Sequence, residues 1–214
     1  TCRELERRGF EVTYLDVQAD GLLDLEAFKA AIRPDTILAS VMAVNNEIGV
    51  IQDLTAIGTI CREKGIVFHV DAAQATGRIE IDLATLPVDL MSLTAHKTYG
   101  PKGIGALYIS AKAKLKLLPQ ILGGGHQRKL RSGTLNVPGI IGLGKASEIA
   151  VNELEKDQNR VSLLRDKLEK GLLQFEGSFV NGNTENRIYN TSNICFPNVN
   201  SEQLILALGN ISVS

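Results

Sequence analysis

The apolar positions of this chain fall into short runs, separated by segments with helical spacing. The runs are FEVTYLDV (10–17), TILASVMAV (36–44), GIVFHVDAA (65–73), DLMSLTAH (89–96) and GIGALYIS (103–110). Several are almost continuously apolar, which is typical of strands covered on both faces. Helical patterns run from Asp24 to Ile32, with Asp24 as an N-cap, and from Thr55 to Lys64, ended by Gly65. This alternation predicts an α/β fold with a mainly parallel sheet flanked by helices.

A different pattern begins at Pro138. Apolar residues recur at helical spacing as far as Leu172, which predicts a long amphipathic helix or a bent pair of helices. A polar loop (181–193), a strand (194–199) and a helix from Ser201 follow. We therefore assign residues 1–150 to part of a large domain, and residues 151–214 to a linking helix and part of a smaller α/β domain.

Charge and composition narrow the classes of partner. Lys and Arg number 23 and Asp and Glu 24, so electrostatics gives no support for a nucleic acid or an anionic membrane. No apolar run approaches the roughly 18 to 20 residues of a membrane span. The three cysteines are widely spread and include no C-x-x-C pair, which favours a reducing compartment. A bacterial cytoplasm is expected ahead of a mitochondrial matrix.

Polar side chains follow three of the predicted strands, at the ends where open parallel sheets bind ligands. They are Asn45 and Asn46 after the second run, Asp71 and Gln74 after the third, and Thr94, His96 and Lys97 after the fourth. Any one of them alone is usually a turn residue, a cap or a solvated charge. A carboxylate, amides and a lysine at three consecutive strand ends together predict a binding site.

Pyridoxal phosphate is a cofactor that needs this set of groups. It requires a lysine for a Schiff base, a carboxylate that keeps its ring nitrogen protonated, and donors for its phosphate. Lys97 and Asp71 supply the first two, and Thr94, His96 and nearby backbone amides suit the third. The stretch GGGHQRKLRSGT (123–134) is also suited to an anion, and its alternative interpretation is a flexible surface loop.

Four motifs resemble those of a known family: VNNEIG, HVDAAQATG, HKTYGPKGIGALY and RSGT. They are similar to the cysteine desulfurases of the IscS/NifS type, and the resemblance runs along all 214 residues. It implies a fold-type I pyridoxal-phosphate transferase that removes sulfur from L-cysteine, giving L-alanine and an enzyme persulfide. It also implies a homodimer that serves iron–sulfur cluster assembly and tRNA thiolation, with iron–sulfur scaffold and sulfur-acceptor proteins as partners.

The resemblance implies a role for each site residue. Lys97 would be the Schiff-base lysine, and Asp71 would be the partner of the ring nitrogen. Gln74 and Asn46 would contact the ring oxygen and the substrate side. Thr94 and His96 would bind the phosphate, and Thr134 would bind the phosphate of the partner subunit. Thr94 stands where relatives often have serine, which keeps the hydroxyl. The segment HQRKLRSGT departs from the commoner acidic and methionine-containing version, although Thr134 is retained.

The resemblance also places some of the family's machinery outside this sequence. A phosphate loop and a ring-stacking histidine are expected before Thr1, and the nucleophilic cysteine after ISVS. Cys195, between apolar neighbours, is predicted to be buried filler. The 214-residue chain alone is therefore expected to be an inactive fragment. The alternatives are a selenocysteine lyase or aminotransferase of the same fold, or a catalytically silent scaffold or dimerisation fragment.

Overall fold

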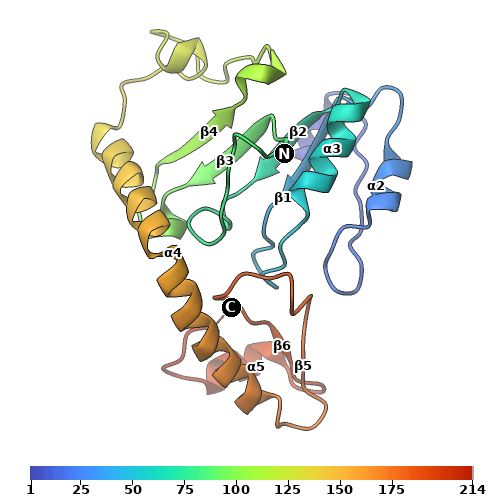
Figure 1. Cartoon of the computed structure of the whole chain (residues 1–214), viewed down its shortest axis with the longest axis vertical. Helices are drawn as coiled ribbons and strands as arrows, with labels where there is room; N and C mark the ends of the chain where they lie inside the picture. The colour runs from blue at the N-terminus through green and yellow to red at the C-terminus, as the bar shows by residue number, and fades with distance from the viewer. Residues whose placement is uncertain (214) are drawn as a thin grey trace.

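The centre of the molecule is a four-stranded sheet with the strand order β1-β2-β3-β4. The structure is a computed structural model that describes residues 1–213. The strands are β1 (Leu38–Met42), β2 (Val67–Asp71), β3 (Leu90–Thr94) and β4 (Gly105–Ile109) (Figure 1). β1, β2 and β3 are parallel and β4 is antiparallel to β3, so the predicted mainly parallel sheet is confirmed.

The direction of β4 follows from the length of its connection to β3. Parallel neighbours need a crossover of a dozen or more residues, and only residues 95–104 separate these two strands. β4 therefore runs back beside β3, with Thr94 opposite Gly105 and Leu90 opposite Ile109. As a result, the chain leaves β4 at the end of the sheet opposite to the carboxyl ends of the parallel strands.

The helices agree closely with the hydrophobic pattern. They are α1 (Cys2–Arg7), α2 (Leu25–Ala31), α3 (Leu54–Lys64), α4 (Val137–Leu172) and α5 (Ser201–Ala207), with short 3₁₀ turns η1 (His96–Thr98), η2 (Ala111–Ala113) and η3 (Gln127–Lys129). Asp24 caps α2 as predicted, and its carboxylate accepts hydrogen bonds from the backbone N–H groups of Glu26 and Ala27. Gly65 ends α3 with a left-handed φ of 68°, also as predicted.

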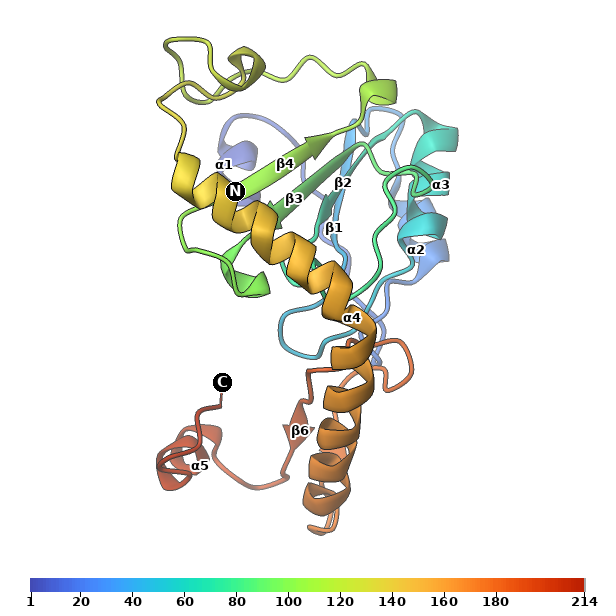
Figure 2. The ribbon, with the colours of Figure 1, turned by 60° about the vertical axis from the view of Figure 1, so that its left-hand side comes forward.

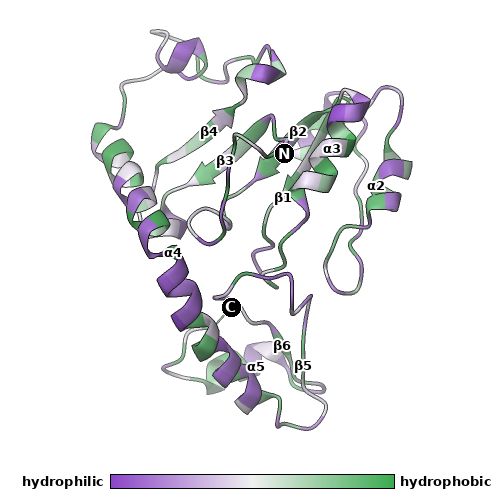
Figure 3. Ribbon diagram, viewed as in Figure 1, coloured by the Kyte–Doolittle hydropathy of each residue, from purple (hydrophilic) through white to green (hydrophobic). Residues whose placement is uncertain are grey.

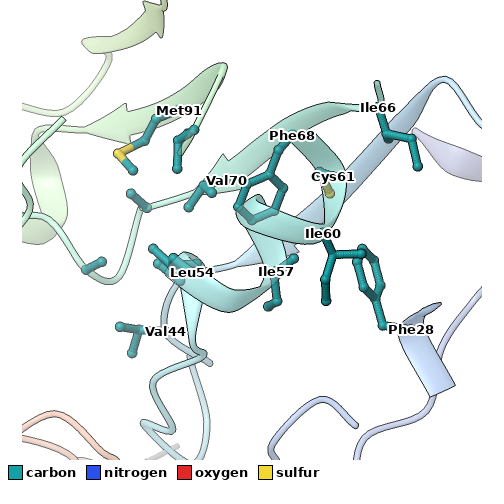
Figure 4. Close-up of a cluster of buried hydrophobic side chains, with 14 of the residues drawn as sticks. Phe28, Val44, Leu54, Ile57, Ile60, Cys61, Ile66, Phe68, Val70 and Met91 are labelled. Carbon is teal, nitrogen blue, oxygen red and sulfur yellow. The ribbon is translucent and has the colours of Figure 1, made fainter. Parts of the chain in front are cut away.

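The core lies between α3 and one face of the sheet (Figure 4). Ile57 of α3, Phe68 and Val70 of β2 and Met91 of β3 have no exposed surface. In β2 and β3 these buried residues alternate with half-buried ones, so within the described chain the strands are fully covered only on the face toward α3. Figures 1 and 2 place α2 and α3 on one side of the sheet and α4 on the other.

The long helix α4 is continuous over 36 residues and changes direction near its middle (Figure 2). Its hydrophobic and hydrophilic positions are interleaved along its length (Figure 3), and several apolar side chains are exposed, including Ile141 at 66% and Val151 at 74%. The proposed domain boundary at residue 150 falls inside this helix and stays a prediction. None of the helices within residues 1–213 is long and apolar enough to cross a membrane.

One strand prediction was wrong and another was right only in part. Residues 10–17 form no strand, because no neighbouring segment within residues 1–213 pairs with them, and Tyr14 and Val17 are mostly exposed. The strand predicted over 194–199 is reduced to β6 (Ile194–Cys195), which pairs only with β5 (Phe179–Val180). The polar loop before it and the helix from Ser201 are as predicted.

Candidate cofactor site

Parallel pairing brings the ends of β1, β2 and β3 to the same edge of the sheet. Asp71, the last residue of β2, lies opposite Met42 of β1 and Ser92 of β3. The backbone continues this pairing, since Ala43 N–H donates to the Asp71 carbonyl at 2.8 Å and Ala72 N–H donates to the Ser92 carbonyl at 3.0 Å. The polar residues that follow these strands therefore start from one edge, as the sequence predicts.

Asp71 is half-buried, and the described chain makes a hydrogen bond to only one of its two carboxylate oxygens. Its Oδ1 accepts a hydrogen bond from Ala73 N–H at 2.9 Å. Its Oδ2 has no hydrogen-bond partner within residues 1–213. A carboxylate anchored through one oxygen, with the other available, is suited to accept from a protonated ring nitrogen.

The segment after β3 turns sharply and presents Lys97. Thr94 Oγ1 and His96 Nδ1 lie 2.9 Å apart, and η1 ends at Thr98 and is followed by Tyr99 in the left-handed conformation, with a φ of 60°. The buried Thr98 ties this turn to the segment after β2, because its hydroxyl donates to the Thr76 carbonyl at 3.0 Å. Lys97 is half-buried, and no carboxylate of the described chain lies within ion-pair distance of its amine. Lysine side chains are usually exposed, as the other lysines of the described chain are.

Arg78, which the sequence reasoning missed, joins the segments after β2 and β3. Its guanidinium donates to Gln74 Oε1 at 2.8 Å and to the Lys97 carbonyl at 2.9 Å. An arginine that follows a glycine in a turn is usually an exposed surface charge, so the sequence pattern does not predict that Arg78 connects Gln74 and Lys97. It ties together two residues that the sequence analysis assigns to the site.

Close approach of α4 explains some of the glycines around the lysine. A Cβ atom on Gly77 would lie 2.7 Å from Ala150 Cβ of α4, and one on Gly142 of α4 would lie 2.6 Å from Pro101 Cγ. Beside Lys97 the packing leaves a pocket of about 140 Å³, lined by Thr76, Gly77, Arg78, Lys97, Thr98, Tyr99, Ala146, Ile149, Ala150, Glu153, Asp157 and Tyr189. Asp71 and Gln74 do not line it, so the pocket lies beside the predicted cluster.

Asn46 is exposed in the loop after β1. Asn45 shapes this loop, since its Oδ1 accepts from the N–H groups of Glu47 and Ile48 at 2.9 and 3.0 Å. The loop is held from the C-terminal part of the chain, where Ile188 N–H donates to the Gly49 carbonyl at 2.9 Å. Asn45 therefore has a structural role in the turn, and Asn46 is the amide that stays exposed.

Thr134 is not joined to the cluster by any hydrogen bond within residues 1–213. It is exposed in the connection between β4 and α4, which leaves the sheet at the opposite edge. The stretch around it folds on itself: Ser132 is buried, and its hydroxyl accepts from Gly125 N–H at 3.1 Å. A role for Thr134 in a partner subunit's site, rather than in its own, is compatible with this position.

The three cysteines lie on other elements. Cys61 is buried in α3, where burial and the nearby Asp89 raise the pKa of its thiol to about 11, while Cys2 is exposed in α1. Cys195 is half-buried in β6, so the prediction that it is buried filler was only partly right. The pair β5–β6 covers it incompletely because each strand has only two residues.

Comparison with protein families matches the whole chain, residues 1–214, to Aminotransferase class-V. The chain belongs to this family, whose members are pyridoxal-phosphate enzymes. Curated relatives named cysteine desulfurase IscS, from Dechloromonas aromatica and Methylococcus capsulatus, are 59% and 60% identical over 214 residues. The chain spans 53% of each, about half of the length of these relatives.

Solved structures give the same fold. A NifS-like protein aligns with a TM-score of 0.91 and 39% identity, over 97% of this chain and 57% of that one. SspA in complex with cysteine aligns with a TM-score of 0.84 and 36% identity, over 100% of this chain and 59% of that one. The fold is therefore that of the fold-type I pyridoxal-phosphate enzymes, as the resemblance implies.

The residues present fit pyridoxal phosphate. Lys97 is half-buried and its amine has no carboxylate partner in the described chain, and Asp71 offers an available carboxylate oxygen from the neighbouring strand. Thr94 and His96, linked at 2.9 Å, offer a hydroxyl and an imidazole to an anion. The lysine and the carboxylate are the groups on which this cofactor's chemistry depends.

Proposed function

We propose that this chain carries the cofactor-binding part of a cysteine desulfurase, a sulfurtransferase that converts L-cysteine to L-alanine and passes on the sulfur. The observation that carries the proposal is a half-buried lysine, Lys97, whose amine has no carboxylate of the described chain within ion-pair distance, at the edge where β2 ends in Asp71. The identity of 59% to 60% with proteins named cysteine desulfurase IscS supports the substrate and the reaction.

In this proposal, bound pyridoxal phosphate supplies an electron sink for the carbon that loses its proton. Lys97 would hold the cofactor, and its amine, once released from the cofactor by the amino group of the substrate, would accept the Cα proton of L-cysteine. Asp71, whose Oδ1 is anchored by Ala73 N–H, would keep a proton on the ring nitrogen. Gln74 would contact the ring oxygen, and Asn46 would face the substrate side.

The remaining predicted residues hold the phosphate. Thr94 and His96 would bind it from the segment that precedes Lys97, and Thr134 would bind the phosphate of a partner subunit. The proposal gives Cys2, Cys61 and Cys195 no part in sulfur transfer, because they lie on α1, α3 and β6 and not on the segments that carry the site.

We also propose a homodimer in a bacterial cytoplasm, which supplies sulfur to iron–sulfur scaffold and acceptor proteins and to tRNA thiolation. Exposed apolar side chains in the connection from β4 to α4 and on α4 support self-association, with Leu118 at 82%, Leu122 at 80% and Ile141 at 66% exposed. Relatives named IscS in several bacteria support the cellular role.

The test uses the native protein that contains this chain, incubated with pyridoxal phosphate, L-cysteine and a reductant. We expect alanine and sulfide in equal amounts. Asp71→Asn should lower turnover at least about 100-fold while keeping bound cofactor, since an amide does not hold the ring-nitrogen proton that the electron sink requires.

Other outcomes of this experiment would support the alternative functions. Alanine from selenocysteine but not from cysteine would identify a selenocysteine lyase, and amino transfer to an oxo acid would identify an aminotransferase. Near wild-type turnover by Asp71→Asn would make Asp71 structural. Failure to bind the cofactor would favour a catalytically silent scaffold.

A further inference from the structure

Arg78 makes contacts that fix the orientation of a neighbouring amide. One of its terminal nitrogens donates to Gln74 Oε1 at 2.8 Å and to the Gln74 carbonyl at 3.2 Å, and the other donates to the Lys97 carbonyl at 2.9 Å. The residue is half-buried, and no carboxylate of residues 1–213 pairs with it. Its donors are therefore directed at the two site segments and not at an acid.

The chemistry of the guanidinium decides which way the Gln74 carboxamide points. Arginine has only donors and stays charged, so the carboxamide atom facing it must be the oxygen. The Gln74 amide nitrogen then points elsewhere, and it has no acceptor within residues 1–213. Any ligand group that meets this nitrogen must be a hydrogen-bond acceptor.

We infer that Arg78 is a positioning residue: it holds Gln74 so that its Nε2 donates to the phenolate oxygen of bound pyridoxal phosphate, and it ties this donor to the Lys97 backbone. The inference rests on the proposed function, because the acceptor is the cofactor's ring oxygen. What it adds to that function is a role for Arg78, which fixes the orientation of the Gln74 amide that donates to the ring oxygen.

A spectroscopic readout separates this role from a purely structural one. The bound cofactor's visible absorption changes with pH, and its unprotonated form carries the most negative charge on the phenolate oxygen. A fixed donor stabilises that form. In the native protein, Arg78→Met should therefore raise the midpoint of the spectral transition by about half to one pH unit, the size expected for one hydrogen bond. It should also weaken cofactor binding about 3- to 10-fold.

Matched variants make the result specific. Arg78→Lys keeps a donor toward Gln74 Oε1 and should restore most of the midpoint. Arg160→Met removes an exposed arginine of α4, whose side chain is 62% exposed, and should leave the midpoint unchanged. In a Gln74→Ala background, Arg78→Met should add little further shift, because the residue through which it acts is gone.

Gln74→Glu gives a test that does not depend on the folding of Arg78→Met. It keeps an acceptor for Arg78 but removes the Nε2 donor, so the midpoint should rise. An unchanged midpoint in Gln74→Glu, a wild-type midpoint in Arg78→Met, or full additivity with Gln74→Ala would each overturn the inference. If the unmodified protein showed no visible cofactor band, the proposed function would fail together with the inference. If the band is present and only the variants behave differently from expectation, the inference alone fails.

Discussion

The sheet and the C-terminal segment (residues 175–213) are held in place by different forces. The sheet and α3 share a core of completely buried apolar side chains, including Ile57, Phe68 and Met91. In the C-terminal segment, only Ile188 is a buried apolar residue within the described chain. That segment is anchored instead by an ion pair between Arg187 and Glu169 of α4, whose side chains are 5% and 10% exposed.

The anchor is a hydrogen-bonded network and not an isolated pair. Arg187 donates to both carboxylate oxygens of Glu169, the second at 2.8 Å, and the Ser192 hydroxyl donates to Glu169 at 2.7 Å. The same segment contacts the loop that carries Asn46, since Ile51 N–H donates to the Asn186 carbonyl at 2.8 Å. Apolar burial thus fixes the frame of the site, and a directional polar contact fixes one of its loops.

The largest effect is expected in the sheet core. Phe68→Ala should lower the free energy of unfolding by about 3 to 5 kcal/mol, because it leaves a cavity among side chains that cannot collapse around it. Chemical denaturation measures this loss.

Phe175→Ala is the matched control in the C-terminal segment. Phe175 is 62% exposed and packs edge-to-face with Phe196 at a centroid distance of 6.1 Å. Its loss should cost only about 1 kcal/mol. Equal losses for the two variants would contradict the comparison.

Breaking the polar anchor should have the next largest effect. Arg187→Met leaves the Glu169 carboxylate buried without its partner, which should cost about 3 kcal/mol, while the Ser192 hydrogen bond remains. The damage should be local, with faster proteolysis of residues 181–200. Arg160→Met, which removes an exposed pair with Asp157, should change stability by about 0.5 kcal/mol or less.

The anchor should also depend on pH in a defined direction. The hydrogen bond from Arg187 holds the pKa of Glu169 below its ordinary value of 4.5, helped by Ser192 and opposed by burial. Because the folded pKa is the lower one, the pair stabilises fully above pH 4.5 and this contribution is lost as pH falls through the folded pKa. Denaturation between pH 7 and 3 should therefore show the gap between wild type and Arg187→Met narrowing in acid.

The smallest effect concerns helix caps. Asp53 caps α3 by accepting from Ala56 N–H at 2.8 Å, and Asp53→Ala should lower global stability by about 1 kcal/mol, since α3 packs on the core. Asn200 caps α5 by accepting from Gln203 N–H at 3.0 Å. α5 contains no buried residue, so Asn200→Ala should speed hydrogen exchange in α5 with little global change. A global loss of equal size would contradict this division.

The parts that sequence reasoning predicted are those governed by periodicity. The buried runs around Phe68 and Met91, the cap at Asp24 and the long helix to Leu172 all have local signals in the chain. Residues 10–17 have the same apolar character but no partner strand within the described chain, so their composition alone was misleading.

The parts that were missed depend on contacts between distant residues. Arg187 and Glu169 lie on different elements, and neither has a neighbour pattern that indicates burial. Arg78 similarly follows an ordinary turn, and only the fold brings it to both Gln74 and Lys97. The strand-end rule predicted where the site begins, whereas the residues that position it became visible only in three dimensions.

The central claim is that the fold builds a cofactor site around Lys97. Reducing the native protein with borohydride in the presence of pyridoxal phosphate fixes the cofactor to the lysine that bears it, and peptide mapping then identifies that residue. We predict the label on Lys97, at the edge where β2 ends in Asp71, and its loss in Lys97→Ala. Label on the exposed neighbour Lys102, or on any other lysine, would contradict the account.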